Sequence, residues 1–130
     1  MIETANSIVM FNGSALDLAG ARRALEATTL TVDGDDQELR VRWADGPVLR
    51  VSLERGPGVL AEAHELGAGT AFVTQLQACD ARLVIAFDDL GAVLDEVNTL
   101  IETQVTLQQA TQGILFNTWN DEMSAPESAE

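Results

Sequence analysis

The sequence predicts an α+β fold in which helices pack on one face of a mostly antiparallel sheet. Residues 39–43 and 48–54 alternate apolar and polar side chains, which is the pattern of strands with one buried face. Asp45-Gly46-Pro47 separates the two segments and indicates a hairpin. Residues 15–27 instead repeat apolar side chains at helical spacing. With 130 residues, 46% of them hydrophobic, the chain is long enough to bury a core as one domain.

The N-terminal half predicts a strand, a helix and three further strands. Leu39, Val41 and Trp43 share the predicted buried face of the strand at residues 39–43. The acidic stretch at residues 33–37 predicts the turn before this strand. The expected elements are a strand at 7–11, a helix at 15–27, and strands at 29–32, 39–43 and 48–54.

The C-terminal half predicts a short helix, two strands, a long helix and a last strand, so the complete order is β-α-β-β-β-α-β-β-α-β. Residues 70–77 fit a helical face as well as a strand, and we favour a strand because residues 78–81 offer a turn before the next one. The long helix carries an apolar stripe of Leu90, Val93, Leu94, Val97, Leu100 and Ile101. The expected ranges are a helix at 58–67, strands at 70–77 and 82–88, a helix at 88–112, a strand at 113–120 and, beyond the domain of residues 1–120, an acidic disordered tail at 121–130.

The charge is strongly negative and unevenly distributed. The formal net charge is −14, every basic residue is an arginine, and residues 83–130 carry nine acids and no base. Such a surface repels phosphate backbones, which argues against nucleic-acid binding, and it favours a basic partner or simply keeps the protein soluble. The sequence contains no apolar run of membrane-spanning length and no basic N-terminal leader, so we expect a cytoplasmic protein that does not bind membranes.

Few residues could support catalysis or bind a metal or cofactor, and we expect neither metal nor cofactor. His64 and Cys79 are the only imidazole and thiol, and no local motif places them together, so we expect a surface histidine and a structural cysteine. The acidic segment at 33–38 lacks the glycine and glutamate spacing of a calcium loop, and a solvated turn explains it better.

One long segment, residues 103–120, contains no charged side chain. Burial in a core would explain this, since buried surface excludes charge. A protein–protein contact would also explain it, since interface cores lose charge and gain aromatic residues. We therefore select Gln104, Gln108, Phe116 and Trp119 as candidate interaction residues and leave open whether they face a core or a partner.

Without the first and last strands, the element order over residues 15–111 is α-β-β-β-α-β-β-α. Together with the length and the acidity, this order resembles the class I type III secretion chaperones and their relatives outside secretion, provided that residues 70–77 form a strand. The resemblance implies a homodimer that binds a segment of another protein without catalysis.

We therefore expect a non-catalytic cytoplasmic module, either chaperone-like or an immunity-type adaptor, that binds another polypeptide. The competing hypothesis is a small enzyme or ligand-binding domain with a pocket formed by Trp43, Trp119, His64 or Asp88.

Overall fold

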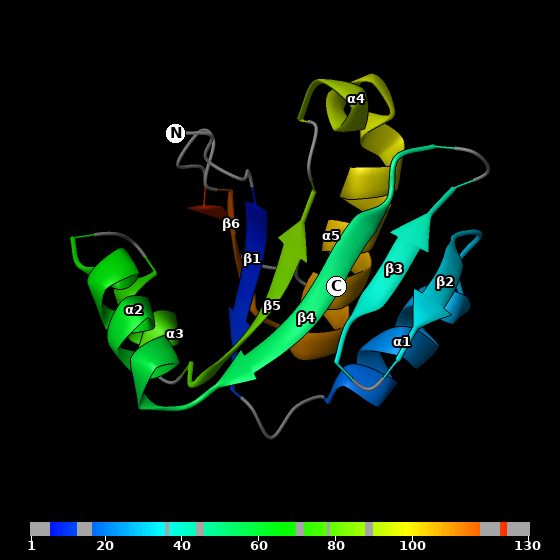
Figure 1. Cartoon of the computed structure of the whole chain (residues 1–130). Helices are drawn as coiled ribbons and strands as arrows, with labels where there is room; N and C mark the ends of the chain where they lie inside the picture. The colour runs from blue at the N-terminus through cyan, green and yellow to red at the C-terminus, as the bar shows by residue number, and fades with distance from the viewer. Residues whose placement is uncertain are drawn as a thin grey trace, which may run out of the picture.

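A computed structural model describes residues 6–12, 17–35, 37–43, 46–69, 72–77, 79–87, 90–117 and 123–124. Its described strands form one sheet in the order β2-β3-β4-β5-β1-β6-β7, and all neighbours are antiparallel (Figure 1). The α+β class and the mostly antiparallel sheet are therefore confirmed. The strands are β1 (Asn6–Phe11), β2 (Thr31–Gly34), β3 (Leu39–Arg42), β4 (Leu49–Arg55), β5 (Ala81–Ala86), β6 (Ile114–Asn117) and β7 (Met123–Ser124).

The described helices lie on both faces of the sheet. Alternation along β1 sends Val9 and Phe11 into a cluster with side chains of α1 and α5, and sends Ile8 and Met10 into a second cluster with α2 and α3. The prediction that helices pack on one face of the sheet therefore holds for α1 and α5. In contrast, α2 and α3 form a smaller layer on the opposite face (Figure 1). The helices are α1 (Leu18–Glu26), α2 (Pro57–Gly67), α3 (Val73–Leu76), α4 (Leu90–Asp95) and α5 (Val97–Thr111).

The larger cluster forms the main core between the sheet and the α1–α5 layer. The predicted alternation holds here, because Leu39, Val41, Leu49 and Val51 are all buried while Arg40 and Arg42 are exposed. Trp43 departs from the prediction, since β3 ends one residue earlier and the Trp43 side chain is 51% exposed.

Within the strand expected at residues 70–77, residues 73–76 are helical instead, and residues 70 and 71 lie outside the described residues. The sheet offers this segment no position beside β5, whose six residues pair with β4 on one side and with β1 on the other. Leu76 is instead buried against α2, where a side chain on Gly67 would approach the Leu76 Cδ1 atom to 3.0 Å. The element order that resembles the type III secretion chaperones is therefore not the order in this fold.

Two further expectations about the C-terminal half change. The expected long helix is broken at Glu96, whose backbone (φ −118°, ψ 45°) separates α4 from α5. Within the expected tail, Met123 and Ser124 pair with Phe116 and Leu115 as β7, and the rest of residues 121–130 lies outside the described residues.

Candidate interaction surface

The inward side of α5 packs on the sheet and is more polar than a typical core helix. Leu100 and Leu107 enter the main cluster, but three threonines and two glutamines are also buried on this side. Each hydroxyl of Thr103 and Thr111 donates to a carbonyl one turn earlier, at 2.8 Å in both cases. These buried hydroxyls are therefore satisfied within the helix itself.

Gln104 is 7% exposed and lies inside the fold. Its Nε2 donates to Ser7 Oγ at 2.7 Å and to Asn117 Oδ1 at 3.1 Å, while Ser7 Oγ donates to the same Asn117 oxygen at 2.8 Å. Because Ser7 lies on β1 and Asn117 on β6, this network ties α5 to two neighbouring strands.

Gln108 makes a second inward contact one turn later. It is 6% exposed, and its Nε2 donates to the carbonyls of Ser124 at 2.8 Å and Gly113 at 3.3 Å. The Ser124 bond holds the two-residue strand β7 against α5. Both glutamines chosen as interaction residues therefore bond to the protein's own chain, and they supply no surface for a partner.

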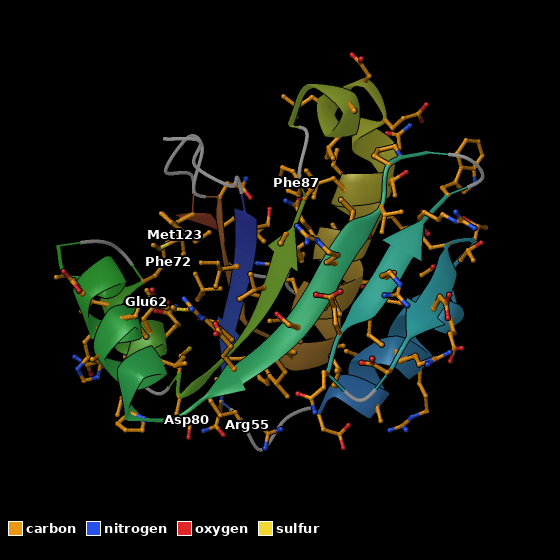
Figure 2. The ribbon with its side chains drawn as sticks, viewed as in Figure 1. Arg55, Glu62, Phe72, Asp80, Phe87 and Met123 are labelled. Atoms are coloured by element: carbon orange, nitrogen blue, oxygen red, sulfur yellow. The ribbon has the colours of Figure 1, made fainter. Side chains whose placement is uncertain are left out.

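The other two candidate residues do not lie on this helix. Phe116 is partly buried and packs in the smaller cluster with Phe72 and Met123. Figure 2 shows Phe72 and Met123 together beside the α2–α3 layer. Trp119 lies outside the described residues, as does Asp88 of the competing enzyme hypothesis.

The outward side of α4 and α5 carries a row of apolar side chains. Among the described residues, seven large hydrophobic side chains are exposed, and four of them lie here. Three of these are spaced by four residues along α5, so they form one row on the helix surface. We call this row together with the exposed Leu94 of α4 the outward stripe: Leu94 (45% exposed), Val97 (37%), Ile101 (47%) and Val105 (42%).

Helix periodicity in the sequence predicted a single stripe from Leu90 to Ile101, and the structure divides it between two directions. Val93 and Leu100 are buried, whereas Leu94, Val97 and Ile101 point away from the sheet. The break at Glu96 changes the phase of the helix, and neither proline nor glycine marks that position in the sequence. The outward stripe was therefore not predicted, although Leu94, Val97 and Ile101 belong to the apolar stripe expected from the sequence.

Charge is distributed unevenly along this outward side. Three acids, Asp95, Glu96 and Glu102, flank its N-terminal half, and no basic residue occurs between 90 and 117. The C-terminal half of this side presents exposed Gln109 and Gln112. The Gln112 side chain donates to the Gln109 backbone carbonyl at 2.9 Å. The surface is thus apolar along its centre, acidic at one end and neutral at the other.

Exposed Trp43 lies near the acidic end of this surface. It lies across a hollow of about 150 Å³ from the start of α5. A hollow of this size is well below the range of about 300–1,000 Å³ that suits a small-molecule ligand, and it could accept one side chain of a partner. Its lining residues are Thr29, Leu30, Trp43, Glu96, Asn98, Thr99 and Glu102.

His64 and Cys79 lie in the α2–α3 layer but form no nucleophilic pair. The His64 ring contacts the Gln77 carbonyl at 3.4 Å, and the Cys79 thiol donates to the Gln75 carbonyl at the same distance. Burial, with a smaller effect of Asp80, raises the pKa of the Cys79 thiol to about 11. An activated cysteine requires the opposite shift, so the expected structural role of Cys79 fits its surroundings.

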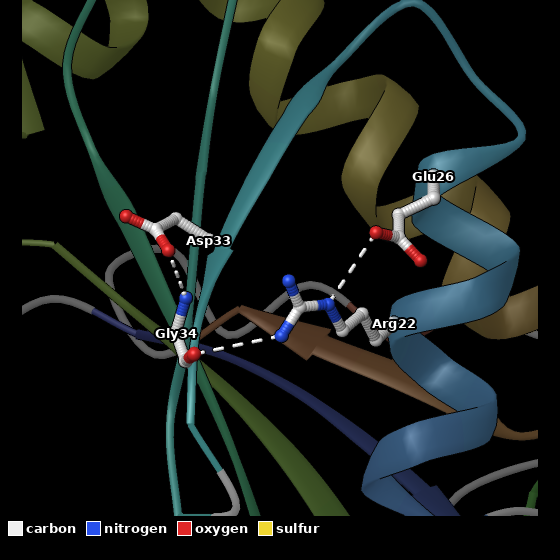
Figure 3. A network of polar contacts seen from close by, with 4 residues as sticks. All are labelled: Arg22, Glu26, Asp33 and Gly34. Carbon is white, nitrogen blue, oxygen red and sulfur yellow. Dashed lines mark hydrogen bonds and ion pairs between the residues drawn. The ribbon is translucent and has the colours of Figure 1, made fainter.

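The acidic turn after β2 is organised by its own hydrogen bonds. The Asp35 carboxylate accepts the backbone N–H groups of Gln37 at 2.8 Å and Glu38 at 3.0 Å, which lowers the pKa of Asp35. Figure 3 shows the neighbouring contacts, in which Arg22 joins Glu26 of its own helix to the Gly34 carbonyl. Among the described residues, no group of three or more acids, histidines or cysteines could hold a metal ion.

Two larger hollows open on the β2–β3 side of the sheet. One, of about 280 Å³, is lined by Asp33, Arg40 and Arg42 with three uncharged neighbours. The other, of about 430 Å³, is lined by Asp17, Arg22 and Asp35 with four uncharged neighbours. Each places arginine beside aspartate, so opposite charges are already present within each hollow.

No family model, curated protein or solved structure matches this chain. Within the part of the chain that the structure describes, no helix combines the length and the apolar character needed to cross a membrane.

Proposed function

We propose that this protein is a non-catalytic interaction module of the cytoplasm that binds another polypeptide through the outward stripe. The observation that carries the proposal is that four of the seven large apolar side chains exposed among the described residues lie on α4 and α5, three of them in one row along α5. Contiguous exposed apolar surface is uncommon on proteins that remain monomeric, and it marks interaction sites.

The composition around the stripe supports a protein partner. Interface centres are depleted of charge, and the exposed C-terminal half of α5 carries glutamines where a solvated helix usually carries Lys and Glu. A helix of 15 residues with a row of apolar side chains is also a common recognition element, because such a row fits a groove or a second helix.

The acidity of the flanking surface supports a preference among partners. Asp95, Glu96 and Glu102 border the stripe, so a polypeptide with basic residues around an apolar centre would gain both burial and charge pairing. The competing enzyme hypothesis gains no comparable support, because His64 is exposed, Trp43 lies in the layer opposite α2, and Cys79 is directed into the α3 turn.

The test compares capture of partner proteins by matched variants. Ile101→Glu and Val105→Glu place a carboxylate on the stripe, and Thr74→Glu places one at an exposed position of α3 as the control. Because all three positions are exposed, each variant should unfold at the same urea concentration as the wild type within error.

After chemical crosslinking in native cells, the stripe variants should recover at least ten-fold less of any specific partner than the wild type, and Thr74→Glu should recover the same amount. Equal recovery by all four proteins would exclude the outward stripe as the contact surface. In a parallel capture without crosslinking, loss of recovery in 0.5 M salt would identify a basic partner, because screening weakens charge pairing at the flanks.

A further inference from the structure

We infer that the outward stripe binds the outward stripe of a second copy, in an antiparallel pair of α5 helices with the two Ile101 side chains on the twofold axis. This inference rests on the proposed function, in that the stripe binds a polypeptide, and it takes a second copy as that polypeptide in place of the basic partner considered above. It is carried by the charge distribution and the spacing of the stripe residues.

The net charge makes most contacts between two copies unfavourable. Each copy carries a formal charge of −14, so two copies repel each other wherever acidic surfaces meet. The exposed positions of α5 carry no charge, and its one acid, Glu102, is partly buried. These exposed residues are Val97, Asn98, Ile101, Val105, Gln109 and Ala110. This face therefore combines low repulsion with apolar surface that gains from burial.

The direction of the pair follows from the unequal ends of this face. A parallel pair would place Asp95 and Glu96 of one copy beside the same acids of the other. An antiparallel pair moves each acidic end towards the neutral half that carries Gln109, whose amide can donate to a carboxylate. It also aligns the two helix dipoles in opposite directions, which is the favourable arrangement.

The register follows from the spacing of the stripe. Val97 and Val105 lie four residues on either side of Ile101, so a twofold axis at Ile101 matches each valine with the other valine of the second copy. A shift of one turn in either direction would replace an apolar contact by a contact with Gln109 or with the acidic junction at Glu96. The contact is isologous and closes at two copies, so it does not generate a filament.

The length of the contact limits its strength. Fifteen helical residues span about 22 Å, which is short for a permanent dimer interface. We therefore expect a reversible dimer with a dissociation constant on the order of micromolar, visible as a concentration-dependent mass in sedimentation equilibrium.

Site-specific disulfide formation tests both the partner and the register. Cys79 is the only native cysteine, so the Cys79→Ala chain provides a background for single cysteines at exposed positions. Under mild oxidation, Ile101→Cys should form a covalent dimer, and Val97→Cys should do so only when mixed with Val105→Cys. Thr74→Cys, on the opposite face of the sheet, is the control that should stay monomeric.

A second measurement uses association without any new disulfide. Ile101→Glu should raise the dimer dissociation constant at least ten-fold, and Thr74→Glu should change it less than two-fold. Gln109→Arg should lower it about three-fold at low salt, because an antiparallel pair brings position 109 towards Asp95 and Glu96 of the other copy.

Each alternative result has one meaning. Covalent dimers from Val97→Cys alone and from Val105→Cys alone would overturn the antiparallel arrangement. A monomeric mass at several hundred micromolar would overturn self-association, as would a dimer that Ile101→Glu leaves unchanged. If the chain is monomeric but stripe variants still lose capture of another protein, the proposed function stands and this inference fails.

Discussion

The buried amide of Gln104 provides the most direct test of how α5 is held to the sheet. Replacing Gln104 by alanine removes two hydrogen bonds, to Ser7 Oγ at 2.7 Å and to Asn117 Oδ1 at 3.1 Å. A net contribution of about 1 kcal/mol for each bond predicts a loss of about 2 kcal/mol in the free energy of unfolding. The loss should not be much larger, because Ser7 and Asn117 remain bonded to each other at 2.8 Å.

Gln109 is the matched control for this substitution. It is the same residue type on the same helix, but it is exposed, so Gln109→Ala should change stability by less than about 0.5 kcal/mol. Urea unfolding followed by circular dichroism measures both variants, and an unchanged slope would show that the denatured state is unaffected.

The reasoning would be refuted if Gln104→Ala were as stable as Gln109→Ala. A double-mutant cycle with Ser7→Ala separates the hydrogen bond from the loss of packing. We expect a coupling energy of roughly 0.5–1.5 kcal/mol between positions 7 and 104, and additive effects would show that the contact contributes nothing specific.

Two further predictions concern other parts of the fold. Gly113→Ala should lower the free energy of unfolding by about 1–3 kcal/mol, because the added Cβ would lie 2.5 Å from the Met10 carbonyl oxygen. Gly58→Ala should be neutral or stabilising, because nothing lies within 4 Å of an added Cβ there. Thermal unfolding measures both variants, and equal stabilities would contradict the prediction. Cys79 should react with iodoacetamide at pH 8 at least ten-fold more slowly in the native protein than in 8 M urea, since the raised pKa favours the neutral thiol. For the same reason Cys79 adds stability below pH 9 that is lost as pH rises towards 11, and Cys79→Ala should lack this loss in alkaline urea titrations.

Local sequence patterns predicted the sheet well because its register follows from alternation. Leu39 and Val41 are buried beside Leu49 and Val51 as the two-residue period requires, and a slip of one residue would have turned Arg40 inward. The strand at 82–88 was also found, since residues 81–86 form β5 in the centre of the sheet. Such segments carry their own pattern and need no knowledge of distant neighbours.

Predictions that depended on distant neighbours were less successful. Residues 73–76 have no place beside β5, because β4 and β1 pair with its two sides, and these residues are helical instead. No local sequence pattern reveals which strands pair with β5. Met123 and Ser124 join the sheet because they pair with β6 and because Gln108 donates to the Ser124 carbonyl. The decapeptide at residues 121–130 nevertheless has the composition of a disordered tail. Gln104 and Gln108 were selected as interaction residues, and the hydrogen-bond partners that the structure gives them include Ser7, Asn117 and Ser124 of the protein's own strands.

The absence of charge in residues 103–120 has two separate causes on α5. On the inward side it follows from burial, because a carboxylate at position 104 or 108 would face the Asn117 Oδ1 atom or the Ser124 carbonyl oxygen with no base nearby. The outward side is under no such constraint, since Val105, Gln109 and Gln112 are exposed to solvent. Folding alone would therefore tolerate charged residues there, as it does at Glu102 on the same helix. Burial therefore leaves the neutrality of these three exposed positions unexplained, and the proposed contact with a second copy would account for it.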